Sequence, residues 1–320
     1  MMSLIYSKAA IPSLEKCLEF ERRQMKSVAW RDMLNRRLFA SVLFLLILSV
    51  SPKESPLAEP QVWQELTPGL YLGLFDPEMR SKICNHKVVI LKIDPKLHAL
   101  RLLSAPELDR KPRTAKEWCK EFALLAAINA SMYQNMEPLR STGYMRNERY
   151  LNNAYINPAF GAFLCFDPVD TSLPPVQIVD RRLQMDWKQV IKGYKTVVQN
   201  YRMISDGKKM GWPQREEIYG SAAIGMDKDN HVLFILSRSP FSTHDLIQIL
   251  LSLPIQIKSA MYVEGGPEAT LYMRVHGKEM TFVGTCETDT AEGEAVKSVQ
   301  RIPNVIGVMK RKGAANAGRD

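Results

Sequence analysis

The sequence predicts an α+β fold, a single domain with a mixed, largely antiparallel β-sheet core and interspersed helices. Three observations support this prediction. Short runs of strand-forming residues recur through residues 59–310, separated by tight polar turns. Two helix-capping patterns interrupt these runs, and no internal repeat is present. The length of 320 residues, of which 46% are hydrophobic, is sufficient for one large domain.

A leader is predicted ahead of this domain. Arg36 and Arg37 directly precede an apolar run at 38–50, and small and proline residues follow it up to residue 58. A basic segment, an apolar run of this length and a small-residue segment together are typical of a secretory signal peptide. The run is shorter than the ~20 residues of a membrane-spanning helix, and a retained membrane anchor is the alternative. We therefore expect a periplasmic or secreted protein that touches a membrane only through an uncleaved leader.

The net charge of +9 is unevenly distributed along the chain. Residues 1–58 hold nine Lys/Arg and five Asp/Glu (+4), and residues 310–320 hold four and one (+3), which leaves +2 for the rest. Most of the positive charge thus lies in the leader and in a predicted flexible tail at 311–320. Charge distributed in this way does not form a nucleic-acid-binding face on the domain. We expect no nucleic-acid partner.

The predicted strands are apolar runs bounded by turn residues. They lie at residues 70–75, 88–93, 99–103, 123–128, 162–166, 176–179, 197–204, 222–226, 232–236, 260–263, 269–275 and 301–309. Polar turns at 94–96 and 227–230 predict two hairpins, each joining the strands on either side of the turn.

Three helices are predicted between these strands. Thr114 and Glu117 form a capping box that opens a helix to about residue 122, and Ser242 opens another to about residue 253. Residues 186–194 have an amphipathic pattern. Residues 132–158 are polar, aromatic and aperiodic, which predicts a long loop. Its arginines, asparagines and hydroxyls are phosphate and sugar binders by type, and the alternative is a solvated surface loop.

One stretch, 258–273, combines a strand, a short polar loop and a second strand. Glu264 ends the first strand, and Gly265 and Gly266 follow it. Glycines allow positive φ and a close approach of a ligand to the backbone N–H groups, which can form an anion-binding concavity. The alternative is a hairpin connection in which the glycines supply only turn geometry.

This stretch resembles the Asp-Gly-Gly-Gly-Ser segment of the phosphodiester glycosidase family. Further segments occur in the family's order. Residues 127–133 resemble Ile-Asn-Gly-Gly-Phe-Phe, 141–143 fall where a glycine-bearing loop is expected, 198–204 resemble Gln-Ser-Gly-Pro-Met-Leu, and 221–227 resemble Arg-Thr-Ala-Ile-Gly-x-Asp. The resemblance runs from about residue 62 to 310 and implies the family's fold.

The sequence also departs from the family pattern. The family aspartate is Glu264 here, and its arginine is Ser221. Other departures are Ala130, Ser131, Pro267, Glu268 and an unexpected Arg202. We expect Arg202 to supply, from a neighbouring strand, the charge that Ser221 lacks. A guanidinium can hold a phosphate through two hydrogen bonds.

The resemblance implies an exported hydrolase that acts on a sugar-1-phosphodiester or a related anionic glycan. A phosphate leaves as an anion without being protonated, so one carboxylate is sufficient where ordinary glycosidases use two. Glu264 is the expected base or nucleophile, with Asn129 as a second catalytic residue. The expected substrate-binding residues are Gly265, Gly266, Thr142, Gly143, Arg146, Asn200, Arg202 and Ser221. The partner is then a carbohydrate or sugar phosphate.

Two other functions remain open. The same pocket on a non-catalytic module would recognise a periplasmic glycan or an anionic metabolite without turnover. A structural cell-envelope protein would lack a convergent pocket altogether. The position of Glu264 relative to Asn129 and an arginine separates these possibilities.

The sequence predicts no cofactor and no metal site, although it leaves a divalent cation open. The five histidines form no ligand-spaced pair, and nucleotide-binding and zinc-protease motifs are absent. Cys84, Cys119, Cys165 and Cys286 follow the leader without a Cys-x-x-Cys pair. In an exported protein they could pair in three ways, although Cys165 lies in a run typical of a core strand.

Overall fold

The computed structural model of the protein describes residues 62–81, 87–285 and 299–311. These residues all belong to one compact unit, Gln61–Asp320. The predicted leader, Cys84, Cys286 and residues 312–320 lie outside the described residues.

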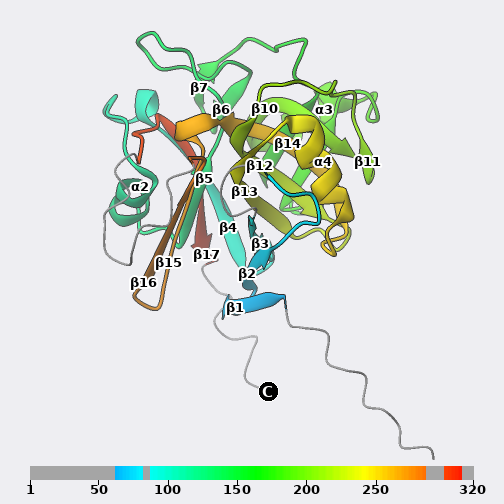
Figure 1. Cartoon of the computed structure of the whole chain (residues 1–320). Helices are drawn as coiled ribbons and strands as arrows, with labels where there is room; N and C mark the ends of the chain where they lie inside the picture. Colours follow the sequence, from blue (N-terminus) through cyan, green and yellow to red (C-terminus); the bar gives the residue numbers. More distant parts are fainter. Residues whose placement is uncertain (1–61, 82–86, 286–298, 312–320) are drawn as a thin grey trace, which may run out of the picture. The chain divides into compact units, whose positions relative to one another are not determined.

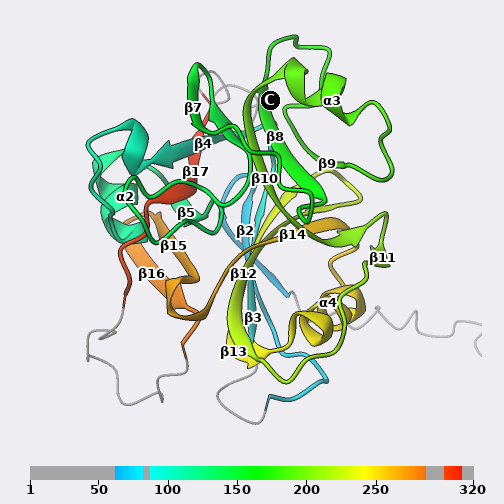
Figure 2. The same cartoon turned by 90° about the horizontal axis from the view of Figure 1, so that it is seen from above.

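Two β-sheets form the unit (Figures 1 and 2). The first has the order β1 (Trp63–Thr67), β2 (Leu70–Phe75), β3 (Val88–Ile93), β13 (Val232–Phe241), β12 (Tyr219–Asp227), β14 (Ile257–Gly265), β10 (Tyr194–Ser205), β6 (Met145–Asn147) and β7 (Tyr150–Asn153). Off this path, β11 (Lys208–Lys209) and β8 (Ala162–Pro168) pair with β10, and β9 (Val176–Asp180) pairs with β8. The second has the order β16 (Lys278–Val283), β15 (Thr270–Val275), β5 (Ala126–Asn129), β17 (Asn304–Lys310) and β4 (His98–Ser104).

The largely antiparallel pairing that the sequence predicts is confirmed, but the single mixed sheet is wrong in two respects. Every strand pairing among the described residues is antiparallel, and the strands divide into two sheets. The unit is mainly β, with few helices between the strands, so it lies at the strand-rich end of the predicted α+β class.

The main hydrophobic core lies between the two sheets. It includes Leu91 and Val263 from the first sheet and Ile128, Leu271 and Ile306 from the second, all of them fully buried. Each such side chain contributes about 1.5–3 kcal/mol through burial. This shared core holds the two sheets face to face. The candidate site is formed by strand ends next to this core.

Helix α4 (Thr243–Ser252) covers the opposite face of the first sheet. Leu246 and Leu250 are fully buried against residues of the first sheet that include Ile235. Ser242 caps the helix, because its hydroxyl accepts a 3.1 Å hydrogen bond from the Asp245 N–H. The sequence therefore predicted this helix and its first turn correctly.

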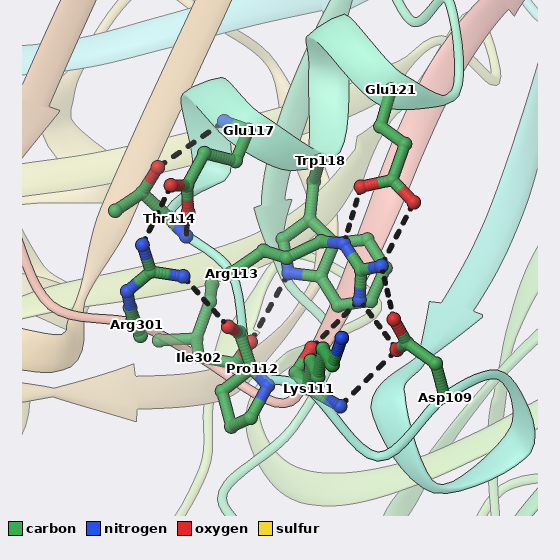
Figure 3. Close-up of polar contacts among 10 residues, drawn as sticks. All are labelled: Asp109, Lys111, Pro112, Arg113, Thr114, Glu117, Trp118, Glu121, Arg301 and Ile302. Atoms are coloured by element: carbon green, nitrogen blue, oxygen red, sulfur yellow. Dashed lines mark hydrogen bonds and ion pairs between the residues drawn. The ribbon is translucent and has the colours of Figure 1, made fainter.

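Helix α2 (Ala115–Glu121) covers the outer face of the second sheet. Both bonds of the predicted capping box between Thr114 and Glu117 are present. Trp118 is fully buried, and its indole N–H donates a 3.1 Å hydrogen bond to the Ile302 carbonyl (Figure 3). The helix is thereby attached to the segment that leads into β17.

Arg113 joins α2 to the loop before it (Figure 3). Its guanidinium forms ion pairs with Asp109 at 2.8 Å and Glu121 at 2.6 Å and lies 4.7 Å from the centre of the Trp118 ring. The hydrogen bonds from Arg113 lower the pKa of Asp109 to about 2. Arg113 therefore acts as a structural cation whose charge is balanced by two carboxylates.

Two short connections pass from one sheet to the other. The turn at Asp94 forms as predicted, since the N–H groups of Leu97 and His98 both donate to its carbonyl. However, β3 pairs with β2 and β13, whereas β4 pairs with β17, so the predicted hairpin is wrong. The second connection joins β14 to β15 after Glu264. It is therefore a crossing between sheets, not a hairpin turn.

Other predicted elements are confirmed in part. The hairpin around residues 227–230 is formed by β12 and β13. The helix expected over 186–194 is a single turn, α3 (Trp187–Val190), followed by a 3₁₀ turn (Ile191–Gly193), because the chain enters β10 at Tyr194. The loop expected over 132–158 contains β6 and β7.

Cys119 and Cys165 are buried free thiols, and burial raises the pKa of both. This confirms the core position expected of Cys165. None of the helices within residues 62–311 that the structure describes has both the length and the hydropathy to span a membrane.

Candidate functional site

Glu264 lies near the end of β14, at the second crossing between the sheets. In the ladder with β12, Glu264 is opposite Ala222 and Gly265 is opposite Ser221, next to an irregularity in the register. The Glu264 carboxylate accepts a 3.0 Å hydrogen bond from the Gly265 N–H. Burial raises its pKa to about 7, and the nearby Glu268 charge acts in the same direction, while the Gly265 bond opposes them. This carboxylate is therefore poised to exchange a proton near neutral pH.

The two glycines after Glu264 are required by the local geometry. A Cβ atom on Gly265 would lie 2.0 Å from the Tyr262 hydroxyl, so a side chain at this position would displace the Tyr262 ring. Gly266 has a φ of +70°, a conformation that residues with a side chain rarely adopt. It begins the 3₁₀ turn η3 (Gly266–Glu268), which leads into β15. The connection can thus turn sharply from one sheet to the other.

Asn129 ends β5 in the second sheet and fixes this connection. Its side-chain amide donates a 2.9 Å hydrogen bond to the Glu268 carbonyl, and its side-chain oxygen accepts a 2.8 Å bond from the Thr270 N–H. The side chain is almost completely buried. Asn129 therefore lies close to Glu264 in the fold, with its carboxamide bound to the backbone of the connection.

Tyr133 and Tyr262 lie near the Glu264 carboxylate. Burial raises the pKa of each phenol, and the charges of Glu264 and Glu268 raise both further. The Tyr262 hydroxyl also shares a hydrogen bond with the side chain of Ser221, which is buried. The site thus places two carboxylates, two phenols and a serine around the crossing.

The segment at 130–143 follows Asn129 directly and is held by contacts that involve three predicted residues, Asn200, Thr142 and Gly143. The Asn200 side-chain amide donates a 2.9 Å hydrogen bond to the Ala130 carbonyl and joins β10 to the segment after Asn129. Its side-chain oxygen is buried and has no hydrogen-bond partner among the described residues. Both the N–H and the hydroxyl of Thr142 donate to the Met132 carbonyl. A Cβ on Gly143 would meet the Phe160 ring at 2.6 Å, so close packing requires this glycine.

The structure does not bring the two expected substrate-binding arginines, Arg146 and Arg202, to Glu264. Arg146 donates to the carbonyls of Ile191 and Tyr194, on the β6 side of the first sheet. Arg202 forms an ion pair with Asp180 at 2.7 Å, and both side chains are only 10% exposed. Among the described contacts, neither guanidinium bonds to Glu264.

The Arg202–Asp180 ion pair is buried, and it uses only one terminal nitrogen of the guanidinium, since the buried Arg202 Nε has no hydrogen-bond partner among the described residues. Burial acts to raise the pKa of Asp180, but hydrogen bonds from Ser205, the Arg182 N–H and Arg202 bring it below its ordinary value. The charge of Arg202 is therefore already balanced. The expectation that Arg202 supplies the positive charge missing at Ser221 is therefore wrong.

Tyr262 is the neighbour of Glu264 that the sequence reasoning missed. Its position two residues before Glu264 was the available signal, although the irregularity in the β12–β14 register between the two residues interrupts the simple alternation of faces along the strand. Tyr133 was noted only as part of the segment after Asn129.

One acidic group that could hold a cation lies elsewhere. Asp227, Asp229 and His231 bring their ligand atoms within 4.8 Å of one another at the β12–β13 turn. Asp227 is already bonded to His231 at 2.9 Å and pairs with Ile257 at the start of β14, whereas Glu264 lies near its end. This cluster does not belong to the Glu264 site.

Comparison with known proteins agrees with the sequence resemblance. The model of the phosphodiester glycosidase family matches residues 123–309, more than half of the chain. That range contains Asn129, Asn200, Ser221 and Glu264. No curated protein sequence matches the chain.

Solved structures share the fold at low sequence identity. A hypothetical protein from Synechocystis is 13% identical with a TM-score of 0.54, and the match covers 78% of this chain and 63% of that one. The zebrafish N-acetylglucosamine-1-phosphodiester alpha-N-acetylglucosaminidase catalytic domain, auto-inhibited by its pro-peptide, is 11% identical with a TM-score of 0.53. That match covers 78% of this chain and 86% of the zebrafish chain.

Proposed function

Because the chain belongs to the phosphodiester glycosidase family, we propose that it is an exported hydrolase of sugar-1-phosphodiesters or related anionic glycans. Glu264 is its catalytic carboxylate. The observation that carries the proposal is the position of Glu264 at the crossing between the sheets, where burial raises its pKa to about 7. A general base is most effective when its pKa is close to the working pH.

In the proposed reaction, the Glu264 carboxylate removes a proton from a water molecule while the water oxygen attacks the anomeric carbon. The bond between that carbon and the phosphate oxygen breaks, and its electron pair leaves with the phosphate. The products are the free sugar, a phosphomonoester and a protonated Glu264, which then releases its proton to solvent. No second carboxylic acid is needed because the phosphate leaves as an anion.

The neighbouring residues position this carboxylate. Asn129 fixes the connection after it through two hydrogen bonds, and the N–H of Gly265 orients one carboxylate oxygen. In this proposal Asn129 is a positioning residue, because its carboxamide is bound to the backbone. The substrate approaches the site beside the Ser221 and Tyr262 side chains.

A glycan- or anion-binding module without turnover is the second candidate. The departures from the family pattern at Ser221, Pro267 and Glu268 favour it. In both candidate functions the ligand lies beside Glu264. Only the hydrolase requires the negative charge of the Glu264 carboxylate.

The test is a screen of the purified full chain against sugar-1-phosphodiesters that vary in sugar, with release of the phosphomonoester as the readout. We expect turnover of at least one substrate. Ligand binding with no turnover across the panel would support the binding module instead. Export is tested separately by cell fractionation, in which a shortened protein outside the cytoplasm is expected; an intact N-terminus in the cytosol would contradict it.

A further inference from the structure

A cavity of ≈ 720 Å³ borders the Glu264 site and combines aromatic rings with arginines. Strands β10, β12 and β14 contribute to its wall, together with the segments around residues 158–161, 181–187 and 210–217. This volume falls within the range of small-ligand sites, which is about 300–1,000 Å³. The cavity is therefore large enough to hold more than one sugar ring.

Three rings form a continuous aromatic wall. Tyr201 is opposite Tyr262 in the β10–β14 ladder, and Trp212 lies 5.5 Å from the Tyr201 ring and 6.1 Å from the Tyr262 ring. All three side chains are half-buried. The Trp212 indole N–H donates to the Arg202 carbonyl, which fixes the ring orientation. Rigid rings of this kind offer flat apolar faces on which the C–H faces of sugar rings can pack.

The cavity is also positively charged. Four arginines line it (Arg181, Arg182, Arg202 and Arg215), against one acidic residue, Glu217. Asp180 balances Arg202. Arg181 donates to two backbone carbonyls, which leaves its charge unbalanced, and lies 4.9 Å from the centre of the Trp187 ring.

Arg182 and Arg215 are the cations available to a ligand. Their side chains are exposed at the cavity and make no hydrogen bond or ion pair within the part of the chain that the structure describes. A planar guanidinium binds carboxylate and phosphate oxygens through paired hydrogen bonds.

Tyr262 links the cavity to Glu264. It lines the cavity and is two residues before Glu264 on β14, and its hydroxyl lies against Gly265 and bonds to Ser221. The wall of the cavity therefore reaches the residues next to Glu264.

We propose that this cavity binds an acidic saccharide, with sugar rings on Tyr201 and Trp212 and anionic groups on Arg182 and Arg215. The proposal deepens the proposed function, on which it rests only for the reaction at the neighbouring carboxylate. It names the substrate class as a glycan that carries anionic groups beyond the bond that is cleaved.

The binding test uses calorimetry and tryptophan fluorescence on the full chain carrying Glu264→Gln, which prevents turnover. The probes are tetragalacturonate and the neutral maltotetraose. We expect tetragalacturonate to bind at least ~10-fold more tightly, which corresponds to about 1.4 kcal/mol, because its carboxylates can accept charge-assisted hydrogen bonds from the arginines. Equal affinity for the two probes would overturn the proposal, and so would tighter binding of adenosine monophosphate than of tetragalacturonate.

Variants locate the binding. Arg182→Gln with Arg215→Gln should remove most of the preference for the acidic probe, whereas the exposed Arg149→Gln on the β6–β7 turn should retain it. Trp212→Leu should weaken both probes. Retention of the preference by the double arginine variant would contradict the assignment to this cavity. If the protein binds the acidic probe but the unmodified chain hydrolyses no substrate, only the proposed function is contradicted. If the unmodified chain hydrolyses a substrate but shows no preference for the acidic probe, only the saccharide site is contradicted.

Discussion

The side chain of Asn129 donates a hydrogen bond of 2.9 Å to the main-chain oxygen of Glu268. This bond joins the end of β5 to the connection that follows Glu264, although the two residues are 139 positions apart in the sequence. Its partner bond, from the Thr270 N–H, is 2.8 Å long. The position of the Glu264 carboxylate, the proposed catalytic group, therefore depends on an amide in the opposite sheet.

Replacement of Asn129 by Asp should test this dependence. The aspartate retains an acceptor for Thr270 but loses the donor to Glu268, which leaves a buried carbonyl without a partner. We expect a loss of about 1–3 kcal/mol in the free energy of unfolding, measured by urea denaturation. The kcat of the remaining folded protein should fall, because the connection is less well fixed. The same change at the exposed Asn230, on the β12–β13 turn away from Glu264, is the control and should alter both quantities much less.

Full activity in a destabilised Asn129→Asp variant would contradict the positioning role. It would leave Asn129 as a residue of the fold alone.

Glu264→Gln should make stability less dependent on pH. The Glu264 pKa rises from 4.5 to about 7 on folding, so the folded state holds the proton more tightly. A raised pKa contributes stability that is present below about pH 4.5 and is lost as the pH rises through about 7. The glutamine resembles the protonated form and does not acquire the charge.

The variant should therefore match the unmodified protein near pH 4.5 and exceed it at pH 8. At pH 8 the unfolding free energies of the two proteins should differ by an amount on the order of 1–3 kcal/mol, since a pKa shift of one unit corresponds to about 1.4 kcal/mol. Urea denaturation at the two pH values measures it. A constant difference across this range would show that burial does not hold the proton on Glu264.

The ion pairs of Arg113 give a stability prediction away from the site. Arg113→Leu leaves Asp109 and Glu121 without their partner and removes the contact with Trp118. We expect a loss of about 1–3 kcal/mol in the free energy of unfolding and unchanged kcat. The exposed Arg110→Leu provides the matched control, with a much smaller loss. A fall in kcat with intact stability would mean that this cluster acts on the active site.

Much of the secondary structure was predictable because its signals are local. The capping residues Thr114 and Ser242 start helices where their side chains bond to the backbone three residues later. The division into two sheets was not predictable in the same way. The Asp94 turn has the same local chemistry whether the next strand pairs with β3 or crosses to the other sheet, so the sequence around it predicted a hairpin.

The site shows the same limit. Glu264, Gly265 and Asn129 were found because they occupy ordered segments of a family pattern. The partner of Arg202 was not found, since Asp180 lies 22 residues earlier and no local pattern connects the two. The aromatic wall was also missed, because Tyr201, Trp212 and Tyr262 come together only through the β10–β14 pairing and the loop after β10.

The most direct test of the account is the turnover of sugar-1-phosphodiesters by the unmodified protein and by Glu264→Gln, measured from pH 5 to 9 on matched folded preparations. For the unmodified protein, kcat should rise with pH and reach half its maximum near the Glu264 pKa of about 7, because only the ionised carboxylate accepts a proton. For the variant, kcat should fall by at least ~10²-fold and lose this dependence. Turnover by well-folded Glu264→Gln at the unmodified rate would contradict the central claim that Glu264 performs the chemistry.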